Sequence, residues 1–218
     1  MNVKLISYSQ GEGYENLQEL VAYCARVSNP SNQNNTTTSQ KLLRYLAREK
    51  HWSPFEMVSA CLEIETTRDI ARQILRHRSF SFQEFSQRYA NPAEDLDISN
   101  LREGRLQDTK NRQNSIETED ADLKLEWLKK QSEVISAARN SYTWAIENGI
   151  AKEQARAVLP EGTTSSRLYM NGTLRSWIHY VELRSSNGTQ KEHRDVAIEC
   201  GKVLSTIFPI MEEFTTPN

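Results

Sequence analysis

A cluster of arginine, histidine and serine side chains in the first half of the chain could bind a phosphate or a nucleotide. Arg76, His77 and Arg78 are consecutive, and Ser86 and Arg88 follow shortly after them. The planar guanidinium of Arg88 presents a fork of donors that matches a phosphate group, and the hydroxyl of Ser86 adds another donor. These residue types therefore predict an anion-binding or nucleotide-binding pocket.

Polar side chains alternate with phenylalanines in the segment that joins these groups. Ser81 and Glu84 are interleaved with Phe80, Phe82 and Phe85. Such alternation is typical of an extended segment with one face buried and the other face lining a pocket. On the polar face, Glu84 could accept hydrogen bonds from ribose hydroxyls or base N–H groups. We expect the three aromatic rings to pack within the protein rather than to stack on bases.

A short amphipathic helix is predicted just before the cluster. Thr66, followed three residues later by Asp69, is a helix-start signal, and Ile70, Ile74 and Leu75 recur at helical spacing. This helix would lead the chain directly into the arginine and histidine residues.

Three arginines fall on one side of this predicted helix. Arg68, Arg72 and Arg76 are spaced by one helical turn, and like charges at this spacing cost roughly 0.2–0.5 kcal/mol per pair. We therefore expect anionic groups to face them, with Asp69 serving Arg72. A simpler interpretation of Arg76 to Arg78 is a cationic helix end, which the helix dipole favours.

The cluster matches the pattern R-H-R-x-x-S-x-x-x-x-S-x-R at every specified position from residue 76 to residue 88. In this it resembles the signature of flavin-dependent thymidylate synthases. Further blocks that look like those of the family follow in the family's order at 25–28, 51–56, 155–160 and 183–184. The resemblance therefore covers most of the chain, and its motif is far more specific than a lone glycine-rich loop.

The resemblance implies the synthesis of dTMP from dUMP by reductive methylation. FAD would carry the hydride, NADPH would be the reductant, and 5,10-methylenetetrahydrofolate would be the one-carbon donor. In such an enzyme the flavin carries out the difficult step, and the protein supplies orientation, charge and exclusion of water. No protein nucleophile is then required.

The resemblance also implies which residues bind each ligand. We expect dUMP to be bound by Gln73, Arg76, Glu84, Phe85, Ser86, Gln87, Arg88, Arg156 and Arg184. We expect FAD to be bound by His51, Ser53, Arg76, His77, Arg78, Glu84, Thr173, Arg175 and His179. Thr173 and His179 depart from the family pattern, although both side chains can hydrogen-bond. Arg184 is expected to be catalytic, because a fixed cation at the pyrimidine edge would favour ionisation at N3 as C5 becomes nucleophilic.

Several helices and few strands, arranged in blocks, favour an α+β fold. The resemblance implies the same class, with helices around a central, mostly antiparallel sheet. It also implies a homotetramer whose active sites draw on more than one subunit. Length and composition suggest a single domain over residues 1–218.

The other elements are predicted from periodicity and turn residues. The predicted elements are strands at 3–8, 58–65 and 163–170, helices at 17–27, 42–46, 123–148, 151–159, 174–181 and 196–211, a polar loop at 28–39 and a long loop or two weak strands at 91–118. Gly149 is expected to end its helix in a left-handed conformation, and Pro209 to kink or end the last one. Asn171 and Gly172 are expected to form a turn, and Arg26 to be a solvated or salt-bridged surface residue.

Composition limits the class of protein. A net charge of -2 and a pI near 6.1 argue against bulk binding of nucleic acid or of anionic membranes. Cys24, Cys61 and Cys200 are widely spaced without C-x-x-C, so neither a disulfide framework nor a metal site is predicted. No apolar run approaches the ~18 residues of a membrane helix, and the first residues do not resemble a secretory signal. We therefore expect a cytoplasmic protein.

Two other functions remain open at this point. A non-enzymatic RNA-binding or nucleotide-binding protein could use the arginines and phenylalanines as a phosphate and stacking platform, although the acidic pI argues against it. A flavin reductase that lacks the methyl-transfer step would oxidise NADPH without ever forming dTMP.

Overall fold

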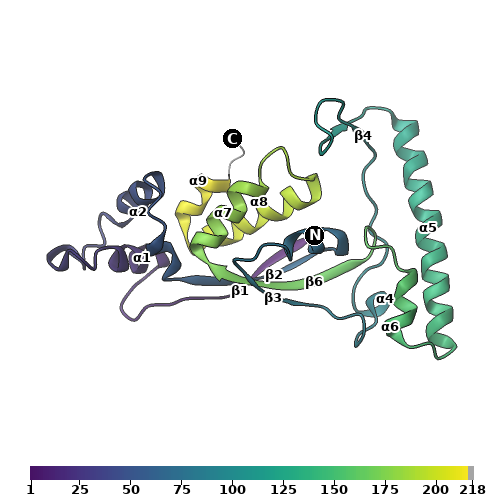
Figure 1. Ribbon diagram of the computed structural model, residues 1–218, viewed down its shortest axis with the longest axis horizontal. Coiled ribbons are helices and arrows are strands. Elements are labelled where there is room, and N and C mark those ends of the chain that lie inside the picture. Colours follow the sequence, from purple (N-terminus) through teal and green to yellow (C-terminus); the bar gives the residue numbers. More distant parts are fainter. Residues whose placement is uncertain (216–218) are drawn as a thin grey trace. The chain divides into compact units, whose positions relative to one another are not determined.

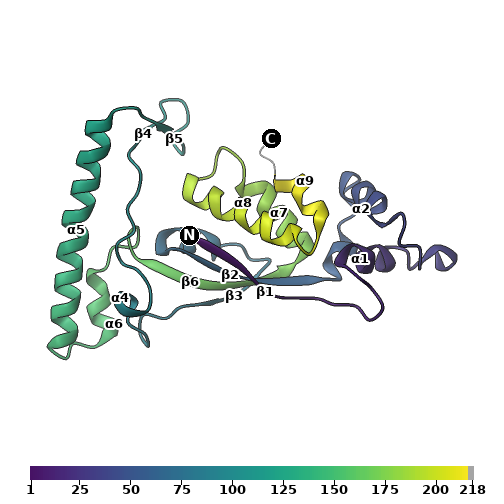
Figure 2. The same cartoon turned by 180° about the vertical axis from the view of Figure 1, so that it is seen from behind.

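The computed structural model describes residues 1–215, and within them the chain forms an α+β fold with an antiparallel sheet. The strands of this sheet are arranged in the order β1-β2-β6-β3 (Figure 1). Their bounds are Asn2–Tyr8 for β1, Ser59–Thr67 for β2, Ser81–Glu84 for β3 and Ser165–Thr173 for β6. A separate antiparallel pair consists of β4 (Arg105–Gln107) and β5 (Ser115–Glu117), both labelled in Figure 2. The predicted fold class is confirmed.

Helices occupy most of the remaining regular structure. Their bounds are Leu17–Ala25 for α1, Ser39–Arg48 for α2, Arg68–Ile74 for α3, Pro92–Asp95 for α4, Ala121–Glu147 for α5, Lys152–Ala155 for α6, Leu174–Arg184 for α7, Lys191–Ser205 for α8 and Glu212–Thr215 for α9. Short 3-10 helices lie at Pro30–Asn32, Ser53–Glu56, Arg156–Val158 and Pro209–Met211. None of the helices in the described part of the chain has the length and apolarity needed to cross a membrane.

The chain divides into two compact units. The first, here called the α5 unit, contains Met1, 65–76 and 83–168, and the second, here called the α7 unit, contains 2–64, 77–82 and the described chain from residue 169 onward. The boundaries fall inside β2, β3 and β6, so each of these strands contributes residues to both units. The signature is divided in the same way, because Arg76 belongs to the α5 unit and His77 to the α7 unit.

The core of the α7 unit forms where α7 and α8 pack together and α8 covers β1. Trp177 of α7 is fully buried, and its indole Nε1 donates a hydrogen bond to the carbonyl oxygen of Ala60 at 3.0 Å. The ring of Phe80 packs edge-on against Trp177, with 4.8 Å between ring centroids. The expectation that this phenylalanine serves packing is confirmed.

The turn predicted at Asn171 and Gly172 is wrong, and the packing around Gly172 shows why a glycine is present there. The strand β6 runs through both residues to Thr173. The ring of Phe80 occupies the space where a Cβ atom of Gly172 would lie, so a larger residue would overlap it. This glycine permits a close approach of a side chain to a strand rather than a reversal of the chain.

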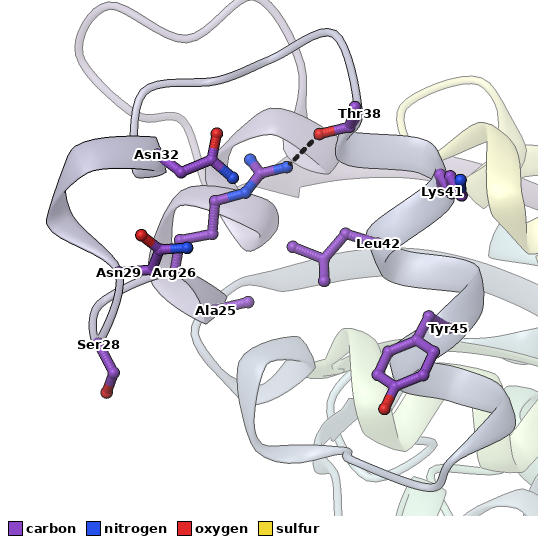
Figure 3. A pocket seen from close by; sticks show the side chains of 9 residues that line it. All are labelled: Ala25, Arg26, Ser28, Asn29, Asn32, Thr38, Lys41, Leu42 and Tyr45. Atoms are coloured by element: carbon purple, nitrogen blue, oxygen red, sulfur yellow. Dashed lines mark hydrogen bonds between the residues drawn. The ribbon is translucent and has the colours of Figure 1, made fainter.

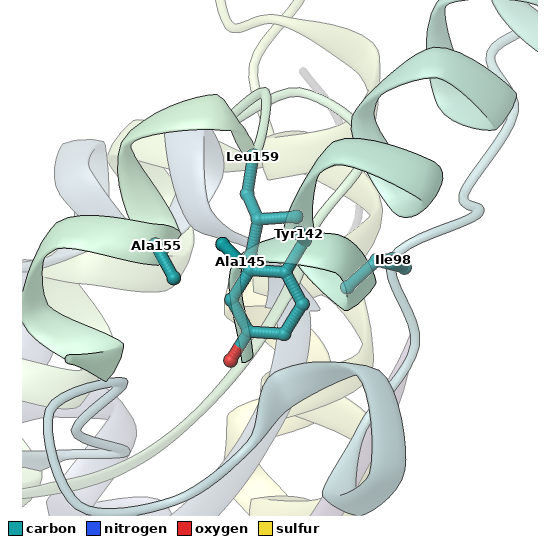
Figure 4. Packing of buried hydrophobic residues seen from close by; sticks show 5 residues of the cluster. All are labelled: Ile98, Tyr142, Ala145, Ala155 and Leu159. Atoms are coloured by element: carbon teal, nitrogen blue, oxygen red, sulfur yellow. The ribbon is translucent and has the colours of Figure 1, made fainter. Parts of the chain in front are cut away.

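One hydrophobic cluster in the core of the α5 unit is formed by Ile98, Tyr142, Ala145, Ala155 and Leu159 (Figure 4). Its residues come from α5, from α6 and the turn after it, and from the segment that follows α4. The phenol of Tyr142 is buried, and burial raises its pKa, with further contributions from nearby carboxylates.

The ends of the elements agree with several predictions and correct others. Gly149 has a positive φ of 75° just after α5, as predicted. The N-cap of α3 is Thr67, so the predicted start at Thr66 is one residue early. The segment expected to be one helix over 151–159 is α6 followed by a 3-10 turn. Pro209 opens a new 3-10 turn after α8 has ended, as its missing N–H requires.

Candidate functional site

The arginines of α3 face carboxylates within the α5 unit. Glu84 lies 3.9 Å from Arg68 (Oε1 to Nη1) and 3.6 Å from Arg72 (Oε2 to Nη1). Glu161 lies 3.8 and 3.4 Å from the same two arginines. The prediction that anionic groups face this helix is confirmed for Arg68 and Arg72.

The predicted partner of Arg72 was wrong. Asp69 is turned toward Arg102, with 2.7 Å between Oδ1 and Nη2, and its Oδ1 also accepts a hydrogen bond from the hydroxyl of Thr67. Gln131 of α5 holds the backbone of Arg102 at both its N–H and its carbonyl group. A contact with a segment more than thirty residues away therefore decides the partner of Asp69.

Glu84 is the best-anchored of the predicted ligand-binding residues in the α5 unit. Besides its two arginines, its Oε1 accepts a hydrogen bond of 2.8 Å from the hydroxyl of Ser166. Burial lowers the pKa of Arg68, and repulsion from Arg72 lowers it further, whereas Glu84 and Glu161 raise it. The two carboxylates therefore offset the charge of the two arginines.

The residues expected to bind the phosphate and base of dUMP follow β3. Arg88 is exposed and lies 3.7 Å from Glu153 (Nε to Oε2), a surface pair of the kind that contributes about 0–1 kcal/mol. The Ser86 hydroxyl accepts a weak 3.4 Å hydrogen bond from the Arg88 backbone. Gln87 is only 3% exposed, yet its amide Nε2 has no hydrogen-bond partner within residues 1–215. A buried donor without a partner is costly, and a ligand oxygen would satisfy it.

The other predicted dUMP residues of the α5 unit vary in exposure. Gln73 and Phe85 are half-buried, and the backbone N–H of Phe85 donates to the Arg167 carbonyl at 2.8 Å. Arg156 is half-buried and donates from Nε to the carbonyl oxygen of Glu153 at 3.3 Å. Except for Arg184, all the residues predicted to bind dUMP therefore belong to the α5 unit.

In the α7 unit, Arg184 is held by a histidine. Its Nε donates a hydrogen bond of 3.0 Å to Nε2 of His77. Because this nitrogen accepts, His77 is neutral with its proton on Nδ1. Among residues 1–215, no carboxylate forms an ion pair with Arg184, so its positive charge is not offset by a side chain.

A buried pair of aromatic residues lies behind His77. The ring of Tyr180 is edge-on to His77 at 5.0 Å, and its hydroxyl lies 3.1 Å from Nε2 of His193. Burial, followed by the charge of Arg184, lowers the pKa of His193 to about 3, and burial raises the pKa of Tyr180. Both side chains are therefore neutral at ordinary pH.

Sequence reasoning missed Tyr180 and His193. In the sequence Tyr180 lies among the apolar residues of α7, and His193 begins the apolar face of α8. Nothing in their spacing indicates a contact, because the packing of α7 against α8 brings them together.

The predicted flavin residues of the α7 unit come from the 51–56 block and α7. Arg175 donates to Glu56 at 2.7 Å, and the ring of His179 is edge-on to Trp52 at 4.6 Å. Burial, followed by the charge of Arg175, lowers the pKa of His179. These contacts bring the block and the helix together within one unit.

The remaining flavin candidates have structural or solvent-facing positions. Thr173 caps α7 by accepting a hydrogen bond from the N–H of Ser176, and His51 and Ser53 are exposed. Arg76 and Arg78 are exposed, and their guanidinium groups have no hydrogen-bond or ion-pair partner in the described chain. Two unpaired arginines in one motif are available to an anionic ligand.

The prediction for Arg26 was wrong. Its side chain is 7% exposed, and it donates from Nη2 to the hydroxyl of Thr38 at 2.9 Å and from Nη1 to the carbonyl oxygen of Asn35. The polar loop after α1 covers this arginine, which the sequence alone did not indicate.

Residues 4–210 match the family model described as thymidylate synthase complementing protein. A probable flavin-dependent thymidylate synthase of Paramecium bursaria Chlorella virus 1 is 49% identical over 211 residues, which are 96% of this chain and 96% of that protein. A flavin-dependent thymidylate synthase of Synechocystis is 50% identical over 190 residues, covering 87% of this chain and 85% of that protein.

The fold resembles that of a solved enzyme. The crystal structure of a UMP/dUMP methylase from Streptomyces cacaoi, bound with 5-Br dUMP, superposes with a TM-score of 0.78 at 28% identity, covering 98% of this chain and 93% of that one. Together with the motif and the sequence relatives, this places the chain in the family of flavin-dependent thymidylate synthases.

Proposed function

We propose that the chain makes dTMP from dUMP by reductive methylation, with 5,10-methylenetetrahydrofolate as one-carbon donor, FAD as hydride carrier and NADPH as reductant. Family membership supports the reaction class. The structural observation that supports the proposal is the pairing of Arg184 with a neutral His77, which leaves the positive charge of Arg184 without a compensating carboxylate and therefore available to a pyrimidine anion.

We assign the phosphate of dUMP to Arg88 and Ser86. Arg88 has one weak surface partner, Glu153, which a phosphate could replace at little cost. The orphaned amide of Gln87 suits a carbonyl oxygen of the base. Gln73, Arg76, Glu84, Phe85 and Arg156 complete the proposed dUMP set.

Arg184 is the residue to which we assign catalysis. A guanidinium beside N3 and its neighbouring carbonyl would stabilise the negative charge that develops as C5 becomes nucleophilic. His77 fixes the orientation of the guanidinium through Nε, and the two Nη groups remain for the pyrimidine. A carboxylate in place of His77 would weaken this effect by offsetting the charge.

The residues present fit a flavin dinucleotide. Arg76 and Arg78 are exposed cations without partners in the described chain, which suits a pyrophosphate. His51, Ser53, Glu84, Thr173, Arg175 and His179, with His77, complete the proposed flavin set. When bound, FAD would supply the hydride chemistry that no side chain can provide.

We also propose that residues 1–218 act as one enzyme domain in a cytoplasmic homotetramer with shared active sites. Large apolar side chains that are exposed on α5 support an assembly. Trp127 is 44% exposed and Trp144 59% exposed, and exposed apolar residues of this size are typical of interfaces.

An anaerobic assay tests the proposal. Purified protein with added FAD is incubated with dUMP, methylenetetrahydrofolate and NADPH, and dTMP is measured against a control without folate. We expect dTMP in the complete mixture and none in the control. NADPH oxidation without dTMP would indicate a flavin reductase instead, and a protein that cannot be loaded with FAD would overturn the proposal. Tight, salt-dependent binding of oligonucleotides without a preference for dUMP would favour a nucleic-acid-binding function.

A further inference from the structure

A cavity of about 480 Å³ lies in the α7 unit, between the end of α1, the polar loop after it and the start of α2 (Figure 3). Arg26, Asn29 and Asn32 line one side, and Lys41 and Tyr45 of α2 line the other. None of the described residues that line it is acidic. None of the residues proposed above to bind dUMP or FAD lines it.

The charge of Arg26 is poorly compensated for a buried group. Its two Nη atoms donate to neutral oxygens, those of Thr38 and Asn35, and no carboxylate pairs with it in the described chain. Burying an ionised group is costly unless an opposite charge accompanies it. The C-terminal end of α1, where Arg26 is the capping residue, offsets part of this charge through the helix dipole.

Lys41 adds a second positive charge to the cavity. It is exposed and forms no ion pair with another described residue. It also lies in the first turn of α2, where the helix dipole disfavours a cation and no acidic residue is present to offset it. Two cations and two asparagines therefore line one cavity, and none of its described lining residues is anionic.

We propose that this cavity binds an oxyanion, a phosphoryl or carboxylate group of one of the co-substrates. The inference rests on the proposed function, because it requires a nicotinamide nucleotide and a folate as co-substrates. The volume lies within the roughly 300–1,000 Å³ of small-molecule sites. Lysine and asparagine side chains donate hydrogen bonds to either kind of oxyanion, so the 2′-phosphate of NADPH and the glutamate carboxylates of the folate share the chemistry of this site.

Binding of inorganic pyrophosphate tests the site without any need for turnover. The melting temperature of the flavin-loaded protein is measured in pyrophosphate and in sodium chloride of equal ionic strength. Lys41→Glu is compared with Lys50→Glu, a charge reversal at an exposed residue just beyond the same helix that does not line the cavity. We expect pyrophosphate to stabilise the wild type and Lys50→Glu alike, and its affinity to fall roughly tenfold or more in Lys41→Glu.

Two outcomes of this experiment would overturn the inference. One is a wild type that pyrophosphate stabilises no more than sodium chloride does. The other is an equal response of Lys41→Glu and Lys50→Glu. Either result would leave the proposed function unaffected, because the assay measures binding alone.

Kinetics then identify the source of the oxyanion. In Lys41→Glu we expect KM to rise roughly tenfold for one co-substrate, while KM for dUMP and the flavin content stay unchanged. If KM rises for NADPH but not for NADH, the oxyanion in the cavity is the 2′-phosphate. If KM rises more for tetraglutamyl than for monoglutamyl folate, the oxyanion is a glutamate carboxylate of the folate. Lys41→Arg should restore the wild-type values. Loss of flavin from Lys41→Glu, or unchanged KM for both co-substrates, would refute the assignment.

Discussion

The two units hold their arginines in different ways. In the α5 unit, Arg68 and Arg72 share the carboxylates of Glu84 and Glu161, so their charges are largely offset within the unit. In the α7 unit, the side-chain partner of Arg184 is a neutral imidazole. An arginine paired with carboxylates mainly positions a neighbouring segment, whereas an arginine paired with a neutral acceptor retains its field for a ligand.

The two pairings also differ in the free-energy cost of burying the arginine charge. A buried charge requires compensation, and Arg68, with a side chain 10% exposed, receives it from two carboxylates. Arg184 is half-buried, so solvent screens part of its charge in the absence of a substrate. The comparison therefore predicts that the α3 arginines matter most for stability and that Arg184 matters most for turnover.

The largest expected effect is that of Arg184→Ala. Loss of the fixed cation should lower kcat by about 10²- to 10³-fold, as the loss of one transition-state donor does elsewhere. Flavin content, read from the visible absorption, should be unchanged, because the residue is assigned to the pyrimidine. Arg184→Lys keeps the positive charge but loses the two-pronged donor geometry of the guanidinium, and it is the matched control. Its kcat should lie between those of the wild type and Arg184→Ala. Full activity in Arg184→Ala would remove this residue from the mechanism.

Glu84→Gln should have the next largest effect, on stability. The change leaves Arg68 and Arg72 with half of their anionic partners and should reduce the free energy of unfolding by about 2–3 kcal/mol. Urea denaturation of the flavin-free protein measures it. Asp122→Asn, at an exposed position in α5, serves as a control that should change little. Equal stabilities of the two variants would contradict the structural role of this carboxylate.

His193 should make stability depend on pH. Its pKa of about 3 in the folded protein lies below the ~6.5 of an unfolded histidine, so its contribution is complete above pH ~6.5. As pH falls from ~6.5 to ~3, the unfolded chain takes up a proton that the folded chain resists, and stability falls by up to about 1.4 kcal/mol per pH unit. His193→Gln can keep the hydrogen bond to Tyr180 without titrating. Between pH 7 and pH 4, the denaturant midpoint of the variant should therefore change less with pH than that of the wild type. If both midpoints change equally with pH, a group other than His193 causes the pH dependence of stability.

A carboxylate placed at residue 77 tests the comparison directly. His77→Glu would give Arg184 the kind of partner that Arg68 has, and His77→Gln would keep a neutral acceptor. Both variants lose the imidazole, and the glutamate also adds a negative charge between Arg76 and Arg78, so flavin binding should weaken in both variants and more in His77→Glu. At saturating flavin, kcat should be about tenfold lower in the glutamate variant, because the carboxylate offsets the charge of Arg184. The comparison fails if the two variants turn over at the same rate.

The smallest effect is expected for Glu153→Gln. This exposed residue pairs with Arg88 at 3.7 Å, and such pairs contribute about 0–1 kcal/mol, so stability should hardly change. Without its competing carboxylate, Arg88 should bind a phosphate at least as well, and titration of the flavin spectrum with dUMP measures that affinity. Weaker dUMP binding in the variant would argue against the assignment of Arg88 to the phosphate.

Much of the fold could be predicted because its signals are local. The alternation of buried and half-buried residues along β2 follows directly from the sequence pattern, as does the left-handed Gly149 after α5. These features depend on the period of a strand and on the absence of a Cβ atom, which neighbouring residues reveal. The same is true of the residue types in the signature, which predicted an anionic ligand before any tertiary contact was known.

The sequence by itself thus determined most of the elements and the cationic residues that precede and follow β3. Tertiary packing decided the partners. It turned Asp69 toward Arg102, covered Arg26 with a loop, and placed Phe80 against Gly172. It also placed His77 on Arg184. Charge and hydrogen-bonding capacity are properties of a residue type and can be read from the sequence. The partner groups come from segments that are distant in the chain, and no local sequence pattern indicates which distant segment will pack there.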